Sequence, residues 1–483
     1  MTGITIQGKS IRHLHLSAFM LLVMLLSHSI VFSQPTFQRL YGTLDNDAGS
    51  SITPCFSGGY LVSGTTTNYF YGDPEIYLVR ITEYGDTLWT RSVSHPSDYD
   101  WNKGVYEHTD HSFLLGNCFY GDTATTLLLK YNDSGDKIWS KSFTFDDDAF
   151  FCSLASATDT GIVICGYHGQ SFPSVFMIKT DNQGDEVWRR SYGGSFMEGY
   201  FPEQMINTAD NAYIICGSVT IGGTELNKGL LIKTDSSGIL SWTKQYESAS
   251  YYKRYFTAIQ QYSDGSYYIT GYDTWSNYFS ADYPFLMKTD PQGNLAWLKY
   301  YDQPHPYRTL SFTAGGNILL AGAYNDTAMI AQADPEGTIT WSANIVSKYA
   351  GSYISQVIAA ADGGYIMAGK AAYHGGFGGD DVLIMKANQY GIITEMQGTG
   401  TKVESAEVSA WPNPCRDKTG IFSKYPVQSV TVYDARGLCL YTNKQEICGS
   451  NSFPVSTAAF PAGMLIFRIE TSGGVFIKKI IKQ

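Results

Sequence analysis

Short apolar runs bounded by glycine and aspartate recur along most of the chain. In order, the copies read "GGYLVSG", "HSFLLGN", "TGIVICG", "NAYIICG", "GSYYITG", "GNILLAG" and "GGYIMAG". Runs of four to six apolar residues between turn-forming residues are typical of β-strands. The pattern therefore predicts an all-β protein built from repeated strands.

A second element follows each copy of the first and contains a turn. In six copies a Trp stands four residues after the turn glycine, and in a seventh copy Glu395 takes its place. An Asp or Asn three residues before the glycine can cap this turn, with the glycine in the left-handed conformation. The Trp residues are spaced by 44 to 55 residues, which leaves room for four strands per repeat. Such repeats predict the blades of a β-propeller.

The N-terminal stretch "FQRLYGT" supplies the strand that the seventh repeat lacks. It matches "WRRSYGG", with Phe37 in the Trp position and Tyr41 in the Tyr position. Pairing the first strand with the last repeat removes two exposed sheet edges. We therefore expect residues 34–397 to form a seven-bladed β-propeller closed by the N-terminal strand. From Phe37 to Glu395 the repeats resemble those of exported propellers of Bacteroidetes-type bacteria.

The first 33 residues predict a secretory leader. A basic start at Lys9 and Arg12 precedes an apolar run, and we expect a signal peptide cleaved between Ser33 and Gln34. An uncleaved membrane anchor is the alternative. No later segment approaches the roughly 20 apolar residues that cross a bilayer. The net charge of −11 argues against nucleic acid or an anionic membrane surface as a partner.

The cysteines fit buried structural positions better than a disulfide framework. Cys165 and Cys216 occupy the same place in two repeats, where the other copies carry Ser, Gly, Thr or Ala. This place requires a small side chain, so we expect both thiols to be buried. Cys415, Cys439 and Cys448 lie together in the sequence near the C-terminus, where one disulfide is possible.

The chain changes character after Glu395. Residues 398–408 are small and polar and predict a linker. Residues 409–483 alternate apolar and polar positions between turns and predict a small immunoglobulin-like β-sandwich. This part resembles the type A C-terminal sorting domain of the type IX (Por) secretion system, at Pro412, Asn413, Pro414, Asp434, Gly437, Gly463, Lys478 and Lys479.

The resemblance implies a route of export. It implies transit through the periplasm, passage through the outer membrane by the type IX machinery, and removal of the sorting domain by a sortase-like protease. The chain would then be secreted or attached to the outer cell surface. An accessory domain that stays attached is the alternative.

The longer connections between strands are rich in aromatic residues beside Asp and Asn. Flat rings with polar groups at their rim suit glycan or peptide ligands. Packing of the same rings between blades is the alternative. The ligand-binding candidates are Tyr69, Tyr71, Trp101, Tyr167, His168, Trp275, Tyr278, Tyr307, Tyr373 and His374.

A recurring cation is expected to belong to the scaffold, because a unique catalytic group should break the repeat rather than follow it. One repeat position carries Lys in five copies, with Arg80 and Gln332 in the other two. The five are Lys130, Lys179, Lys233, Lys288 and Lys386.

No local motif assigns a catalytic residue or a cofactor. A nucleophile elbow and a phosphate-binding loop are both missing from the sequence. His108 and His111 would point to opposite faces if they lay on a strand, which argues against a metal site. Residues 146–148 are three aspartates that could offer oxygen ligands to Ca²⁺, but they lack a glycine-anchored loop. We expect no metal or cofactor, with Ca²⁺ as the open alternative.

The sequence favours a secreted or surface-displayed propeller that binds a glycan or a protein. A hydrolase or lyase acting on an extracellular polysaccharide at the same face is the alternative, and two converging carboxylates would favour it. A purely structural surface-layer component is a third possibility.

Overall fold

A computed structural model gives the arrangement of the chain. It describes residues 35–482 with the exception of 44, 68–73, 94–98, 121–122, 196, 225, 249–251, 276–282, 302–306, 325–326, 346–350, 373–378, 390–392, 394–407, 412–414, 416, 424–425, 435–438, 444–451 and 472–473. The chain divides into two compact units, Gln34–Thr399 and Gly400–Gln483. The described part of both units consists of strands and turns without a helix, which confirms the all-β prediction.

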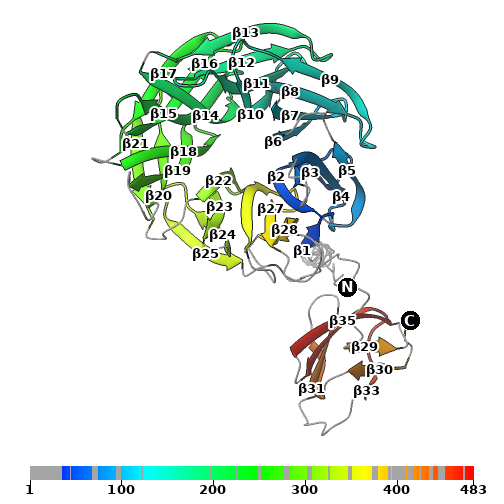
Figure 1. The fold of residues 1–483 in the computed structure, drawn as a ribbon. Helices are drawn as coiled ribbons and strands as arrows, with labels where there is room; N and C mark the ends of the chain where they lie inside the picture. Colours follow the sequence, from blue (N-terminus) through cyan, green and yellow to red (C-terminus); the bar gives the residue numbers. More distant parts are fainter. Residues whose placement is uncertain are drawn as a thin grey trace, which may run out of the picture. The chain divides into compact units, whose positions relative to one another are not determined.

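The larger unit is a ring of four-stranded antiparallel sheets, and each sheet uses strands that are consecutive in the chain except where β1 joins the last sheet (Figure 1). The first strand of each sheet contacts the first strand of the next, and β26 contacts β2, so the ring closes. This arrangement is that of a β-propeller. The innermost strands are β2 (Asn46–Pro54), β6 (Tyr99–Glu107), β10 (Ala149–Ser156), β14 (Glu198–Asn207), β18 (Tyr252–Gln261), β22 (Tyr307–Phe312) and β26 (Tyr353–Ala359).

The middle strands hold the core. Their apolar side chains pack in layers between neighbouring sheets and are almost fully buried. The second strands are β3 (Tyr60–Thr67), β7 (Phe113–Tyr120), β11 (Ile162–His168), β15 (Tyr213–Ile221), β19 (Tyr267–Trp275), β23 (Ile318–Tyr324) and β27 (Tyr365–Ala372). The third strands are β4 (Pro74–Ile81), β8 (Ala124–Tyr131), β12 (Ser174–Thr180), β16 (Asn227–Thr234), β20 (Tyr283–Thr289), β24 (Thr327–Ala333) and β28 (Asp380–Ala387). Cys165 and Cys216 are buried here as free thiols, as predicted.

The outer strands carry the repeated Trp residues, which fasten each sheet to the next. Each ring lies over the turn glycine of the following sheet, so a methyl group added to that glycine would come within 3.0 Å of the ring. These glycines have positive φ values, as predicted. The pairs are Trp89 with Gly135, Trp139 with Gly184, Trp188 with Gly238, Trp242 with Gly293 and Trp297 with Gly337. The outer strands are β5 (Thr87–Val93), β9 (Lys137–Phe143), β13 (Glu186–Tyr192), β17 (Leu240–Tyr246), β21 (Leu295–Tyr300) and β25 (Ile339–Ile345).

The N-terminal strand β1 (Phe37–Tyr41) is the outer strand of the last sheet. It pairs antiparallel with β28 along its full length, and all five of its residues are buried. Phe37 lies over Gly85 of the next sheet, as the Trp rings do elsewhere. The Tyr41 hydroxyl donates to the Gly85 carbonyl at 2.5 Å, and Tyr192 makes the same bond to Gly238. The predicted match of "FQRLYGT" to the repeat, and the closure that it implies, are confirmed.

The C-terminal unit contains two sheets around its own core. One sheet has the order β29 (Val408–Trp411), β30 (Lys418–Ser423), β33 (Ser452–Ser456). The other has the order β32 (Cys439–Asn443), β31 (Val427–Asp434), β34 (Gly463–Thr471), β35 (Gly474–Lys482). Alternate apolar residues of β31 and β34 meet with Cys415 and Val455 in one buried cluster.

Candidate functional site

Every innermost strand carries a β-bulge at the same place. In each pairing of a first strand with a second strand, the register shifts by one residue and leaves one residue unpaired between its neighbours. A bulge adds an unpaired residue and re-aims side chains, and such positions are frequent beside functional sites. The bulged residues are Ser50, Lys103, Cys152, Glu203, Thr257, Arg308 and Ser355.

The bulges surround a cavity of about 370 Å³ on the axis of the ring. All seven innermost strands contribute to its lining, and six of the seven bulged residues line it. Lys103 stands at the remaining bulge, and its side chain lies outside the described part. A cavity of this size matches a small-molecule site.

Two charged residues line this cavity, at a repeat position where four other sheets carry Ser, Thr or Cys. Arg308 on β22 and Glu203 on β14 are both exposed in it. The guanidinium of Arg308 lies over the ring of Tyr353, 5.6 Å from its centroid, and makes no hydrogen bond or ion pair with the described residues. Burial raises the pKa of Tyr353, while Arg308 acts to lower it and Glu203 to raise it. The cavity is therefore lined by one cation and one carboxylate, and the Tyr353 ring lies against the guanidinium.

Polar side chains next to the bulges hold the lining together. The side-chain carbonyl of Gln204 accepts a hydrogen bond from the backbone N–H of Ile259 at 2.8 Å, in the next sheet. The carbonyl of Gln356 likewise accepts from the N–H of Ile52 at 2.7 Å, across the seam between the last and the first sheet. These bonds join neighbouring sheets beside the cavity. One bulged side chain takes part as well, because the Thr257 hydroxyl lies 3.2 Å from the carbonyl oxygens of Thr270 and Tyr307, to which it donates.

Two of the predicted aromatic candidates lie together at the end of β11. Tyr167 stacks on Phe150 with ring centroids 4.8 Å apart and meets Phe201 of the next sheet edge-on. His168 stacks on Phe145 at 4.5 Å. Burial lowers the pKa of His168, which keeps its imidazole neutral at physiological pH. Both rings are half-buried, so one face of each is used in packing.

The structure places the other candidates apart from this pair. Tyr307 begins β22 and is only 2% exposed, with its ring edge-on to Tyr301, so it packs inside the propeller and offers little surface to a ligand. Trp101 lies in β6 and Trp275 ends β19, and their side chains are outside the described residues. The same holds for the whole of Tyr69, Tyr71, Tyr278, Tyr373 and His374.

The recurring lysines are scaffold, as predicted. Each forms an ion pair with the Asp of the turn between the first and second strands of its own sheet. The pairs are Lys130–Asp110, Lys179–Asp159, Lys233–Asp210, Lys288–Asp264 and Lys386–Asp362. In the two sheets without Lys the turn carries Ser57 or Gly315 instead of Asp, so cation and anion are replaced together.

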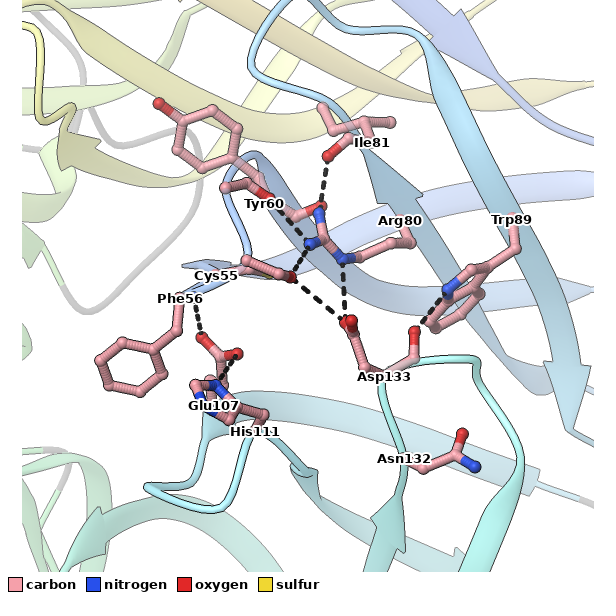
Figure 2. A network of polar contacts seen from close by, with 12 residues as sticks. Cys55, Phe56, Tyr60, Arg80, Ile81, Trp89, Glu107, His111, Asn132 and Asp133 are labelled. Carbon is pink, nitrogen blue, oxygen red and sulfur yellow. Dashed lines mark hydrogen bonds and ion pairs between the residues drawn. The ribbon is translucent and has the colours of Figure 1, made fainter.

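Figure 2 shows the contacts of Arg80, which stands where the other sheets carry the recurring lysine. Its guanidinium donates to the Ile81 carbonyl at 2.8 Å and to the Ser57 hydroxyl at 2.7 Å, and lies 3.7 Å from Asp133 of the next sheet. Nearby, Glu107 accepts from the Phe56 N–H at 2.6 Å, and burial raises the pKa of this carboxyl. These contacts join turns of two neighbouring sheets, and Arg80, Glu107 and Asp133 are not among the residues that line the axial cavity.

The residues considered as metal ligands from the sequence lie in turns and connections of the propeller. His108 and His111 lie in the turn after β6, so the argument from strand spacing does not apply to them. His108 is buried against the carbonyl of Thr160, while His111 is exposed. Asp148 accepts a hydrogen bond from the Ala124 N–H at 2.8 Å. Among the described residues no three or more His, Cys, Asp or Glu side chains are grouped to hold a metal ion.

One pair of carboxylates converges at the seam where the ring closes. Oxygens of Asp47 and Asp381 both lie within 3 Å of the place where a side chain on Gly42 would begin. Burial raises the pKa of Asp381 to about 6, and the charges of Asp47 and Asp380 add to the effect. Asp47 is fully buried and accepts from the Thr43 N–H, so it is shielded from a polymeric substrate.

Four of the predicted sorting residues lie in described strands of the C-terminal unit, two of them at strand ends. Asp434 ends β31 and is buried, and Gly463 begins β34 with a φ of 125°. Lys478 and Lys479 lie in β35. The remaining ones, Pro412, Asn413, Pro414 and Gly437, lie outside the described residues, as do Ser33 and Gln34.

The C-terminal unit has a recognisable family. Residues 409–483 match the family described as "Secretion system C-terminal sorting domain", which confirms the predicted sorting domain. A domain of this family directs export and attachment at the outer cell surface, so the chain is an exported protein. In the described part, no helix has the length and apolar character to cross a membrane.

The propeller is similar to solved structures only at low identity. A polysaccharide lyase is 12% identical, with a TM-score of 0.48, 75% of this chain and 94% of that chain covered. Virginiamycin B lyase from Staphylococcus aureus is 12% identical, with a TM-score of 0.47 and 72% and 97% covered. A periplasmic gluconolactonase from Pseudomonas aeruginosa is 13% identical, with a TM-score of 0.45 and 61% and 84% covered. No curated protein matches the chain.

Proposed function

We propose that the chain is a seven-bladed β-propeller displayed outside the cell as a binding module for a glycan or protein ligand. Its first 33 residues are a signal peptide, and residues 409–483 are an immunoglobulin-like sorting domain read by the type IX machinery and removed by a sortase-like protease. The observation that carries the binding role is the cavity on the axis, which all seven innermost strands line.

The contents of the cavity favour binding over cleavage. Glycoside hydrolysis uses a pair of carboxyl groups about 5 to 10 Å apart that flank the substrate. Among the described residues Glu203 is the single carboxylate that lines the cavity. The other charged residue of the lining is Arg308, two sheets further around the ring. The other converging pair contains Asp47, which is fully buried. A cation, a carboxylate and hydroxyl groups around one space suit recognition of a polar ligand.

An array of glycans and extracellular proteins tests this proposal. The exported chain, labelled and applied at constant ionic strength with and without Ca²⁺, is expected to bind a subset of the glycans. A variant with Ser355→Trp and Ser50→Trp, which fills the cavity, should lose these ligands while its thermal unfolding stays close to that of the wild type. Retention of all ligands by this variant would move the binding site away from the cavity. No binding to any glycan or protein would contradict the proposal.

A further inference from the structure

Arg308 is the feature of the cavity that the scaffold does not explain. The recurring cations of the propeller are each paired with a turn carboxylate, whereas Arg308 makes no hydrogen bond or ion pair with the described residues. It stands at a bulge whose equivalents in four other sheets are Ser, Thr or Cys. A charged side chain that lines a cavity and makes no hydrogen bond or ion pair with the described residues is typical of a ligand contact rather than of support for the fold.

The chemistry of the guanidinium selects an oxyanion. Its five donors form a planar fork that matches the two oxygens of a carboxylate. The ring of Tyr353 holds one face of the fork at 5.6 Å from the ring centroid, so the edge of the fork stays open to the cavity. In a chain with a net charge of −11, the Arg308 guanidinium brings a positive charge to the lining of the axial cavity, which suits an anionic group of a ligand.

Glu203 limits what the rest of the ligand can be. It lines the same cavity from β14, two sheets away from Arg308 around the ring. A carboxylate is an acceptor, so the part of the ligand next to it must donate hydrogen bonds. The hydroxyls of Ser50 and Ser355 line the space as well and can donate or accept, while the Thr257 hydroxyl donates to backbone carbonyls and can only accept. A ligand with one carboxylate and several hydroxyl groups satisfies all of these residues at once.

We infer that the channel of the propeller is a subsite for an acidic sugar, with Arg308 binding its carboxylate and Glu203 accepting from its hydroxyl groups. The cavity volume of about 370 Å³ holds one or two sugar units. The inference rests on the proposed binding function and names the class of glycan that the site selects.

Calorimetric titration of the exported chain tests the inference with simple probes. Glucuronate is the acidic sugar, glucose is the same ring without the carboxylate, and acetate is the carboxylate without the ring. Glucuronate is expected to bind about tenfold or more tightly than glucose and than acetate. Equal binding of glucose removes the role of the carboxylate, and equal binding of acetate removes the role of the sugar hydroxyls, so either result overturns the inference.

Variants locate the subsite. Arg308→Gln is expected to weaken glucuronate binding about tenfold or more, and Arg308→Lys to weaken it less because the charge stays while the fork is lost. Glu203→Gln should weaken glucuronate and leave acetate unchanged. Lys137→Gln removes the same charge as Arg308→Gln from an exposed place on β9 and should bind glucuronate as the wild type does.

The two proposals fail in different ways. Wild-type binding of glucuronate by Arg308→Gln would overturn the acidic-sugar subsite, and so would an absence of glucuronate binding in a chain that still binds other glycans on the array. In both cases the broader binding function stands. If the wild type binds no glycan or protein on the array, both the binding function and the acidic-sugar subsite are overturned.

Discussion

At the scale of the residue, the repeated side chains and the unique ones have separate tasks. A lysine that recurs with its turn aspartate fastens strands, and a tryptophan that recurs with its turn glycine fastens sheets. Arg308 and Glu203 follow neither pattern, and both line the axial cavity. Function in this chain is therefore to be sought where the repeat is broken.

Asp381 gives the propeller a predictable dependence on pH. Its pKa is raised to about 6 from 3.8 by burial and by the neighbouring carboxylates. A carboxyl group whose pKa is raised on folding favours the protonated folded state, so stability falls as the pH rises from about 4 to about 6. Because the group is half-exposed, solvent screening limits the effect to about 1 kcal/mol at neutral pH.

Removing this carboxylate should stabilise the chain. Asp381→Asn is expected to raise the free energy of unfolding by about 1 kcal/mol at pH 7 and to have no such effect at pH 4. Urea unfolding followed by Trp fluorescence at the two pH values measures the difference. Glu336→Gln, at an exposed turn between β24 and β25, removes one negative charge elsewhere and serves as the control. Equal effects of Asp381→Asn at both pH values would refute the assignment.

At the scale of the element, the N-terminal strand closes the ring. Phe37 is 1% exposed and packs on Gly85 as the tryptophans pack on their glycines. Phe37→Ala removes this contact and leaves a cavity, so we expect it to lower the free energy of unfolding by about 3 to 5 kcal/mol.

An exposed residue of the neighbouring sheet is the matched control for this substitution. Leu88 on β5 is 54% exposed, and Leu88→Ala should change the free energy of unfolding by less than about 0.5 kcal/mol. Both values come from the same urea titrations. Similar values for the two variants would show that β1 does not contribute to the stability of the ring.

The elements are predictable from the sequence because their signals are local. Strand periodicity, turn glycines and the match of Phe37 and Tyr41 to the repeat all lie within a few neighbouring residues. Tyr307 shows the limit: its surroundings resemble a connection, but it begins β22 and is buried. Which aromatic ring packs inward depends on the adjacent sheet, and the sequence of one strand does not contain that information.

The axial site could have been found by aligning the first strands. At the bulge the seven copies read Ser, Lys, Cys, Glu, Thr, Arg and Ser, while the second residue after the bulge is apolar in every copy. A charged residue at a position that elsewhere is small is the available signal. The convergence of Glu203 and Arg308 still required the ring, because they are more than a hundred residues apart in the chain.

At the scale of the whole molecule, we propose that the C-terminal unit directs export and that the propeller binds the ligand. The sorting domain occupies residues 409–483, and the candidate site lies in the propeller. A chain truncated after residue 408 is therefore expected to fold its propeller but to stay in the periplasm. Fractionation of the native host, with antibody detection in periplasm, outer membrane and medium, measures this. Arrival of the truncated chain at the surface in normal amounts would contradict the division.

We propose above all that the propeller binds an extracellular glycan without cleaving it. One incubation of the exported chain with soluble polysaccharides, neutral and acidic, tests it most directly when bound polymer is measured by co-sedimentation and released oligosaccharides are measured in the same tube. We expect retention of an acidic polysaccharide with no increase in reducing ends or unsaturated ends, and reduced retention by Arg308→Gln. Release of oligosaccharides that grows with time would contradict it and identify the chain as a polysaccharide-degrading enzyme.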